Sequence, residues 1–365
     1  MKRLRAELEA AGAFEHREAA GWAKFAFALA ALVLACVGVA RGPAWAWAAL
    51  VPIAAVAAMT ATLIGHEGSH GSFSSRPASN RLLVHVTMPL LSGISGVYWK
   101  HKHDVLHHGH PNVASKDPDV DLWPMASSSA DYERAGPLQR WFQRNLQGYL
   151  FWPATLGLPT SMRLASYADL ARRLRAQGPR RALVVDAAGI AGHYALWLLL
   201  PALLWGALPA LALYAAVWTL TGPMLAAIFA PAHIGMPVMV DEHRDWRHQF
   251  ETTRNFRTPR WLSFFYVGLD RQVEHHIFPK IPHQNLRRAA VVVRRWCGEV
   301  GLPYHEVGLG EALRSVTAFM HDAWQLDATS ARGGVAGRPK TGPARAPASD
   351  VGGGLDPVGP SALSG

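Results

Sequence analysis

The stretch GHEGSHGSF, residues 65–73, closes a long apolar run and places two histidines four positions apart. On a helix, His66 and His70 share one face and can bind one metal ion, while Glu67 between them is available as a general base. The stretch therefore allows two interpretations. Either the glutamate takes part in metal-assisted hydrolysis, or the two histidines are one corner of a larger metal site.

The apolar run before this stretch is one of four that have membrane-spanning length. Each is near the ~20 residues that a helix needs to cross the hydrocarbon core. The runs cover residues 22–40, 44–64, 183–204 and 208–231. Short turns join the first run to the second and the third to the fourth, so the pattern predicts two transmembrane helical hairpins. A shorter, interrupted apolar stretch at 82–97 predicts a re-entrant or surface-lying helix pair.

The charge distribution is also typical of a membrane protein. Charged residues make up 17% of the chain, against ~25% in a typical soluble domain. The formal net charge is +10, and Arg41 is the one basic residue in the two short turns. The positive-inside rule then predicts that both termini and the polar segment between the hairpins are cytoplasmic. The basic residues suit anionic lipid headgroups, and the absence of a nucleic-acid-binding motif argues against nucleic acid as a partner.

Three parts are expected along the chain. Residues 1–21 form a cytoplasmic N-terminal segment, residues 22–328 a membrane domain, and residues 329–365 a Gly/Pro/Ala-rich tail that is predicted to be disordered. The expected fold is an all-α integral membrane protein, with four spans in two hairpins and a cytoplasmic helical cap that holds a histidine-rich dimetal site.

Three histidine clusters lie on the predicted cytoplasmic side. The second cluster is in WKHKHDVLHHGHPNV (99–113) and the third in LDRQVEHHIFPKIPHQNL (269–286), while His233 stands alone where the fourth run ends. Spacings of three or four residues let each cluster project from one helical face. Neutral imidazole suits Zn, Fe, Cu or Ni, and the clusters offer about twice the four ligands of a structural zinc site. The pattern therefore predicts two metal ions.

Carboxylates stand beside all three clusters. Glu67, Asp104 and Glu274 are candidates to orient the imidazoles through hydrogen bonds. Ordinary helix polarity explains them equally well.

Taken in order, the clusters resemble the three histidine boxes of the membrane fatty acid desaturases. GHEGSHGSF is similar to the first box and KHDVLHHGHPNV (102–113) to the second, in its HxxxHH form. GLDRQVEHHIFP (268–279) is similar to the QxxHH third box of the front-end and sphingolipid branch. The stretches HIGM (233–236) and WRHQFETTRN (246–255) resemble that branch as well, and the similarity runs from about residue 22 to about residue 295.

The resemblance implies a di-iron, O2-dependent enzyme that introduces a double bond into an acyl chain. The ligands that it implies are His66, His70, His103, His107, His108, His233, His275 and His276. Gln272 stands where many relatives carry a ligating histidine, and its role as direct ligand, water-mediated ligand or neighbour stays open. His101 and His110 flank the second box and are left out. The histidines that belong to no box are His16, His243, His248, His283, His305 and His321. His85 and His193 lie in apolar stretches and are expected to be ordinary helix residues.

Several relatives carry a fused cytochrome b5 domain with an HPGG motif, which this sequence lacks, and it has no GxGxxG motif for a flavin or nicotinamide. The expected electron donor is therefore a separate ferredoxin or cytochrome b5-type protein with its reductase. The expected substrate is acyl-CoA or a membrane acyl-lipid, and the expected location is a bacterial inner or plasma membrane. Candidate residues for the acyl-chain slot are Phe73, Trp99, Phe265 and Tyr266, which core or interface packing explains as well.

Three alternatives remain. A di-iron hydroxylase or ketolase of the same superfamily would share the ligands and add oxygen to the substrate. A membrane zinc metalloprotease would use HEGSH with Glu67 as general base, but it leaves the other two clusters unexplained. A metal transporter or sensor would need ligands along a path within the spans, whereas the clusters lie outside the apolar runs.

Overall fold

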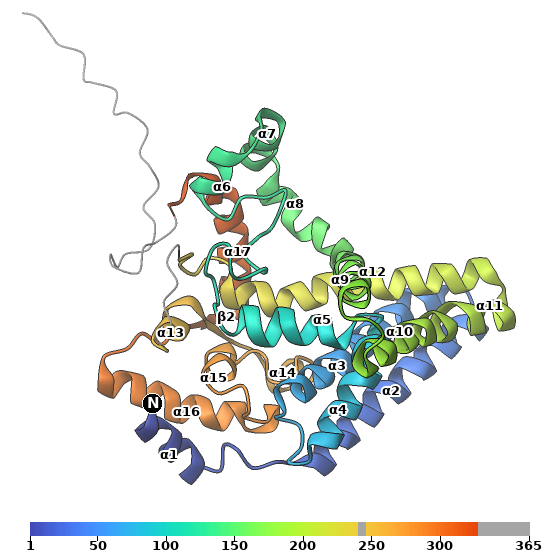
Figure 1. The fold of residues 1–365 in the computed structure, drawn as a ribbon, viewed down its shortest axis with the longest axis horizontal. Coiled ribbons are helices and arrows are strands. Elements are labelled where there is room, and N and C mark those ends of the chain that lie inside the picture. Colours follow the sequence, from blue (N-terminus) through green and yellow to red (C-terminus); the bar gives the residue numbers. More distant parts are fainter. Residues whose placement is uncertain (240–245, 328–365) are drawn as a thin grey trace, which may run out of the picture.

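The computed structural model describes residues 1–239 and 246–327. Over these residues, four helical segments are long and apolar enough to cross a membrane. They are α2 (Glu18–Arg41), α3 (Trp45–His70), the segment Arg181–Trp205 and α12 (Ala207–His233). The third segment consists of α10 (Arg181–Tyr194), the π-helical turn η4 (Ala195–Leu199) and α11 (Leu200–Trp205). The chain is thus a multi-pass membrane protein with the two hairpins that the sequence predicts (Figure 1).

The second span extends six residues beyond its predicted end, because the helix continues through the first histidine cluster to His70. It stops where Gly71 adopts the left-handed conformation at φ 68°, which glycine reaches without steric cost. Spans α2, α3 and α12 share an apolar core that includes Leu32, Val51 and Val217. This packing places the C-terminal end of α3 beside that of α12.

The third apolar stretch forms a bent pair of helices. α4 (Pro77–His85) continues into the π-helical η1 (Val86–Ser92), and α5 (Gly96–Lys100) continues into the π-helical η2 (His101–His107). The two halves are bent by 113°, and Gly93 turns the chain at φ 69°. Asp186 of α10 accepts hydrogen bonds from the Ser95 hydroxyl (2.6 Å) and the Val97 amide (2.9 Å). The bent geometry is that of a re-entrant loop or a broken span, and it is longer than the predicted 82–97.

The segment between the bent pair and the third span forms an arm of short helices. Its elements are α6 (Ser129–Arg134), α7 (Pro137–Asn145), α8 (Gln147–Ala154), the 3₁₀ turn η3 (Thr155–Gly157) and α9 (Leu158–Gln177). In Figure 1, α8 and α7 lead away from α9 and the spans, towards the top of the view.

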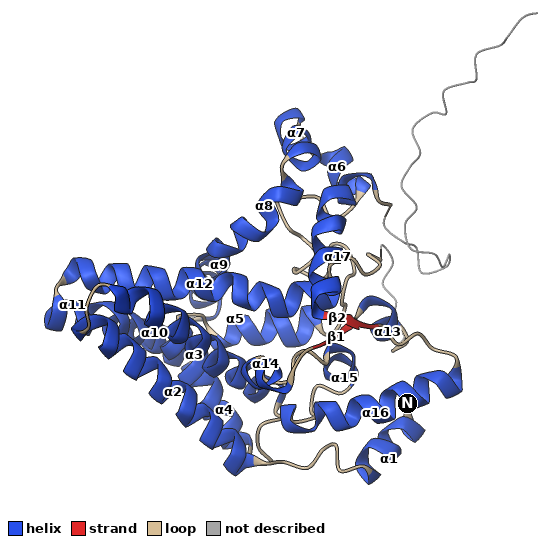
Figure 2. Cartoon of the chain, turned by 180° about the vertical axis from the view of Figure 1, so that it is seen from behind, coloured by secondary structure: helices blue, strands red, loops and turns tan. Residues whose placement is uncertain are grey.

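The cap follows the fourth span. Its helices are α13 (His248–Thr252), α14 (Arg260–Phe265), α15 (Gln272–Ile277), the 3₁₀ turn η5 (His283–Asn285), α16 (Leu286–Val300), α17 (Leu309–Asp322) and the 3₁₀ turn η6 (Ala323–Gln325). One short parallel pair of strands, β1 (Asn255–Arg257) and β2 (Glu306–Gly308), departs from the all-α expectation (Figure 2). The pairing holds the two ends of the third-box segment together.

The N-terminal helix α1 (Lys2–Ala10) belongs to the cap. Leu4 and Leu8 are fully buried in the apolar core that α1 shares with α16. The first span begins at Glu18, four residues before its predicted start. The division into 1–21, 22–328 and 329–365 stays a prediction, and the tail 329–365 lies outside the described residues.

Candidate metal centre

Four elements that are far apart in the sequence bring their histidines to one place, where α3 and α12 end. The end of α3 supplies His66 and His70, and the end of α12 supplies His233. The π-helical η2 and the residue after it supply His103, His107 and His108, and α15 supplies His275 and His276. Each of these side chains can offer a ring nitrogen to one of two groups of histidines, and His103 and His107 also form a third possible group with Asp119.

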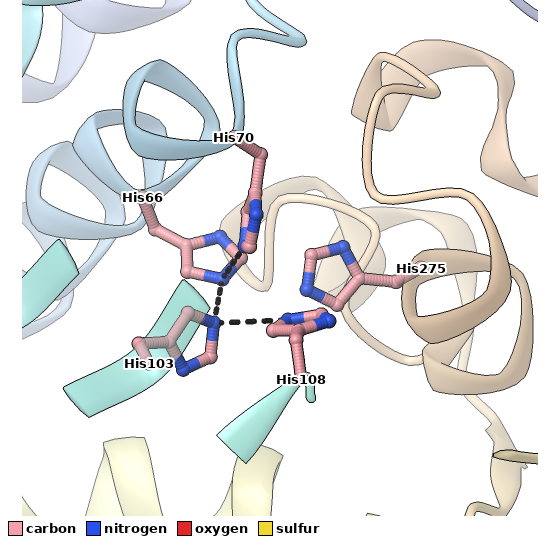
Figure 3. A group of neighbouring side chains, drawn as sticks. All are labelled: His66, His70, His103, His108 and His275. Carbon is pink, nitrogen blue, oxygen red and sulfur yellow. Dashed lines mark hydrogen bonds between the residues drawn. The ribbon is translucent and has the colours of Figure 1, made fainter. Parts of the chain in front are cut away.

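The first group contains five histidines whose ligand atoms all lie within 4.8 Å of one another (Figure 3). Its members are His66, His70, His103, His108 and His275. The Nε2 atom of His66 lies 2.7 Å from that of His103 and 3.2 Å from that of His70. The Nε2 atoms of His103 and His108 are also 3.2 Å apart. Bonds of about 2.0–2.1 Å from one central ion to neighbouring imidazoles give similar nitrogen separations.

The second group contains three buried histidines, His107, His233 and His276. Their ring centroids are 4.7–4.9 Å apart. Among the described residues, neither ring nitrogen of His233 has a hydrogen-bond partner, and the same holds for Nε2 of His276. Buried polar atoms are rarely left unpaired, because that costs free energy. A metal ion bound by these nitrogens would satisfy them.

The protonation state of the centre also suits a metal. Burial, followed by the neighbouring imidazoles, holds the pKa of His108, His275 and His276 well below the usual range of histidine. These rings are therefore neutral near pH 7, which is the form that binds metal ions. The residues fit two metal ions, one for each group.

Adjacent histidines divide between the two groups, and this differs from the expectation that each cluster shares one face. His103 lies with His108 in the first group, whereas His107 lies in the second. The reason is the π-helical η2, in which the His108 amide donates to the His103 carbonyl (2.9 Å). Five residues then make about one turn. His275 and His276 divide in the same way, because neighbours on an α-helix point about 100° apart.

Gln272 lies at the start of α15 and is buried, and its amide nitrogen has no hydrogen-bond partner among the described residues. Its role as a ligand stays a prediction. The flanking His101 is exposed, and neither it nor His110 belongs to either group of the described residues. His193 is a buried helix residue as expected, since its Nδ1 lies 2.9 Å from the Leu91 carbonyl oxygen. His243 lies outside the described residues.

The three candidate carboxylates have different neighbours. Glu67 does not turn towards the histidine groups: its carboxylate accepts hydrogen bonds from the backbone amide (2.7 Å) and the Nδ1 (2.5 Å) of His283. Asp104 accepts from the Ser69 hydroxyl (3.1 Å) and lies 3.6 Å from Nδ1 of His70. Of these two carboxylates, the structure places Asp104 beside a histidine of the two groups.

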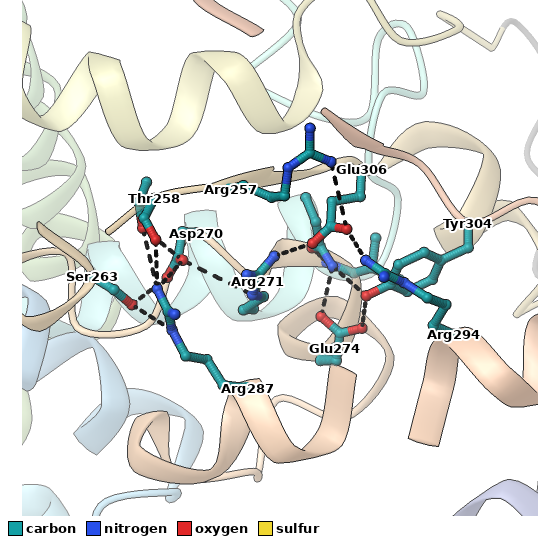
Figure 4. A network of polar contacts seen from close by, with 12 residues as sticks. Arg257, Thr258, Ser263, Asp270, Arg271, Glu274, Arg287, Arg294, Tyr304 and Glu306 are labelled. Carbon is teal, nitrogen blue, oxygen red and sulfur yellow. Dashed lines mark hydrogen bonds and ion pairs between the residues drawn. The ribbon is translucent and has the colours of Figure 1, made fainter. Parts of the chain in front are cut away.

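Glu274, the third candidate, points away from the imidazoles and holds the third box in place. It accepts hydrogen bonds from the Asn255 amide and the Tyr304 hydroxyl, both at 2.9 Å (Figure 4). Nearby, Asp270 accepts from Thr258 (2.8 Å) and Ser263 (2.7 Å). These bonds fix both the start and the middle of α15.

Sequence reasoning missed three residues that contact the histidines or their neighbours. Both oxygens of Asp117 lie 3.0–3.1 Å from Nδ1 of His107. The Gln249 amide oxygen lies 3.2 Å from Nδ1 of His276. His283 was not predicted to take part in the site. Its Nδ1 atom contacts the Glu67 carboxylate, and its Nε2 atom lies 2.8 Å from Nζ of Lys24. The one available signal was the resemblance of the stretch 246–255, which contains Gln249, to a desaturase branch; no local periodicity marks Asp117 or His283.

The four candidate slot aromatics lie in different places. Phe265 and Tyr266 line an apolar cavity of about 380 Å³ between α3, α12 and α14. The ring of Trp99 stacks on that of His103, with centroids 4.7 Å apart. Phe73 instead packs edge-on against Trp22 in the core.

A family model described as fatty acid desaturase matches residues 43–308. The chain belongs to the fatty acid desaturase family. This match confirms the resemblance that the three boxes carry.

Named relatives agree with this assignment. Fatty acid desaturase 3 of Bos taurus is 30% identical over 270 residues, which cover 72% of this chain and 58% of the relative. The sn-1 linoleoyl-lipid 6-desaturase of Synechocystis sp. is 28% identical, with 66% and 70% covered. The Delta 8-(E)-sphingolipid desaturase of Emericella nidulans is 26% identical, with 66% and 47% covered. The chain therefore spans little more than half the length of several desaturases that it matches.

Proposed function

We propose that this chain is a membrane fatty acid desaturase that introduces a double bond into an acyl chain, with O2 and two electrons from a separate donor. The observation that carries the proposal is the pair of buried histidine groups at the ends of α3 and α12. Eight imidazoles in two adjacent groups suit two ions of a transition metal. The family assignment supports iron among the metals that imidazole suits.

Each group would hold one iron ion. The first ion would be bound by His66, His70, His103, His108 and His275, and the second by His107, His233 and His276. Gln272 of the third box is a further candidate ligand. Iron with O2 supplies the oxidising power to remove hydrogen from an unactivated C–H bond, which side chains lack. The chain's own residues would hold the ions and bring the substrate to them.

The apolar cavity beneath the groups is the candidate site for the acyl chain. It is lined by Met59 of α3, by Met224 and Ala227 of α12, and by Trp261 and Phe265 of α14. Met59 precedes the first histidine of α3 by seven residues, or about 10 Å along the helix. Such walls would hold a flexible hydrocarbon chain in one path towards the metal ions.

Between the cavity and the histidines stands Phe229 of α12. Its ring centroid is 6.4 Å from that of His66 and 6.5 Å from that of His103. A side chain in this position would set how close a methylene group approaches the centre.

In the proposed reaction, the acyl chain loses two hydrogen atoms and O2 is reduced to two water molecules. The substrate supplies two of the four electrons, and the donor supplies the other two. A ferredoxin or a cytochrome b5-type protein with its reductase suits this role, and the acyl carrier is CoA or a membrane lipid. We place the histidine groups and both termini in the cytoplasm of a bacterial cell, on the positive-inside rule.

The alternative enzymes are less well supported. A metalloprotease needs Glu67 as a free general base beside the metal, whereas its carboxylate is bound by His283. The names of the relatives favour desaturation over hydroxylation or ketone formation.

The test is gas chromatography–mass spectrometry of total fatty acids from a host that expresses the chain together with a ferredoxin and its reductase. The wild type is compared with His107→Ala and with the matched control His101→Ala, which alters an exposed histidine of the same box. The proposal expects a new double bond in the wild type and the control but not in His107→Ala. A new hydroxyl group instead would assign the chain to the hydroxylases.

A further inference from the structure

The arm formed by α7 and α8 exposes large apolar side chains on one face, although it lies outside the four candidate spans. Leu138 is 80% exposed and Tyr149 70%, and Trp141 and Leu150 are exposed as well. We call these four side chains the outer face. Scattered exposed apolar residues are common on proteins, but a contiguous set usually contacts something apolar.

The opposite face of α7 carries glutamines that turn inward, whereas the buried side of α8 holds Phe151 beside Gln147. Gln139 and Gln143 both donate to the Pro124 carbonyl, at 3.0 and 2.9 Å. Gln147 donates to the Met320 carbonyl (2.8 Å) and accepts from the Ala126 amide (2.8 Å). A helix on a water-soluble surface shows the reverse arrangement, with amides outside and leucine or tryptophan inside. The inverted arrangement indicates an apolar environment around the outer face.

A backbone contact places the end of the arm at the depth of the membrane. A Cβ atom on Gly222 of α12 would lie 2.0 Å from the Thr155 carbonyl oxygen, so the chain directly after α8 presses against this span. Gly222 lies eleven residues before His233, which is about 16 Å from the cytoplasmic end of the helix. From this contact, α8 and α7 lead sideways rather than towards the distal part of the cap at α16 (Figure 1).

The charges on the arm also suit a lipid surface. Within α7 and α8, which cover 137–145 and 147–154, the charged residues are Arg140 and Arg144, and both are exposed. Arginines beside an aromatic face are typical of helices that lie at the membrane interface. Their sign complements anionic headgroups of the cytoplasmic leaflet.

We propose that the outer face lies in the cytoplasmic leaflet of the bilayer, as a lateral membrane contact that continues the lipid-facing surface of the spans. Trp141 and Tyr149 sit at the level of the headgroups, and Leu138 and Leu150 contact the acyl chains. This contact braces α17, and with it the cap, against the membrane. It does not depend on the reaction that the centre carries out.

The test uses spin labels on single cysteines in vesicles of phosphatidylcholine and phosphatidylglycerol. Leu138→Cys and Tyr149→Cys are prepared in the full chain with Cys36→Ala, while the buried Cys297 stays in place and the unlabelled background serves as a blank. Accessibility to O2, which concentrates in lipid, is compared with accessibility to a water-soluble nickel chelate. Leu203→Cys, at a site 76% exposed on the third span, is the lipid control, and Val291→Cys, at a site 72% exposed on α16, is the water control.

The proposal expects both arm labels to show a ratio of O2 to nickel accessibility that is several-fold above that of Val291→Cys and close to that of Leu203→Cys. Labels as open to nickel as Val291→Cys would show that the face lies in water and would overturn the proposal. Labels shielded from both agents would show that protein covers the face, whether a second copy or another chain, and would overturn it equally. The two arm sites are read independently, so one poorly folded variant does not decide the outcome.

Discussion

The five-histidine group and the three-histidine group lie side by side, but the chain surrounds them to different degrees. The first group draws its nitrogens from α3, η2 and α15, and several of them lie as close as 2.7–3.2 Å. The second offers three imidazoles, and one of these, His233, has no hydrogen-bond partner among the described residues. Metal sites that exchange ligands during a reaction keep an open position. The difference suggests that the first group mainly retains its ion, and that the second leaves room for small molecules.

The largest expected effect comes from removing one imidazole from each group in turn. His233→Ala leaves two histidines in its group, whereas His70→Ala leaves four. We expect His233→Ala to lower the yield of desaturated product at least 100-fold, and His70→Ala to lower it less. Product per milligram of membrane-inserted protein measures both. A larger loss in His70→Ala would reverse the proposed difference between the groups.

The carboxylate neighbours sharpen the same comparison. Asp117 lies within hydrogen-bond distance of Nδ1 of His107 in the second group, whereas Asp104 lies 3.6 Å from Nδ1 of His70 in the first. Asp117→Asn should reduce iron affinity or activity by roughly 10–100-fold, because the His107 ring loses the nearer of its two carboxylate neighbours, while Asp119 stays at 3.5 Å. Asp104→Asn should have a smaller effect. Iron retained during titration with a chelator measures the affinity, and equal losses in the two variants would contradict the assignment.

Glu67 tests whether the first group works with a general base. The hydrogen bonds of Glu67 to His283 join the end of α3 to the segment after the third box. Glu67→Gln should lower the free energy of unfolding by roughly 1–3 kcal/mol while part of the activity remains. Thermal unfolding and product yield are measured on the same preparation. Complete loss of activity in a variant with unchanged unfolding and iron content would show that Glu67 takes part in the chemistry.

The smallest effect is expected at Gln272, which lies beside the second group's His276 on α15. Gln272→Ala should lower activity by less than Asp117→Asn, whereas Gln272→His should keep most of it. The absorption spectrum of the iron-loaded protein is recorded for both variants. If Gln272→Ala loses as much iron as His233→Ala is expected to lose, the amide of Gln272 is a direct ligand.

The sequence allowed the membrane hairpins and the histidines of both groups to be predicted, and for physical reasons. Spans of about 20 apolar residues have few alternatives in a lipid environment. Histidines spaced by three to five residues remain close in any helical conformation. The way that the groups divide was not predictable from spacing, because it depends on the π-helical form of η2, which brings His108 over His103.

Contacts across the fold were also beyond the sequence. Asp117, Gln249 and His283 reach their partners only because the bent pair, the fourth span and the cap pack around one point. Glu67 shows the same limit: the spacing in HEGSH indicates a general base, and the packing of His283 against α3 turns it into a structural acceptor. The outer face of α7 could be recognised only after the structure showed that its glutamines are buried.

The most direct test of the two-group account is the metal content of the purified chain. Elemental mass spectrometry measures iron and zinc separately in the same sample. The account predicts two iron ions per chain in the wild type, and one in His233→Ala with the first group intact. A single ion in the wild type, or zinc in place of iron, would contradict it.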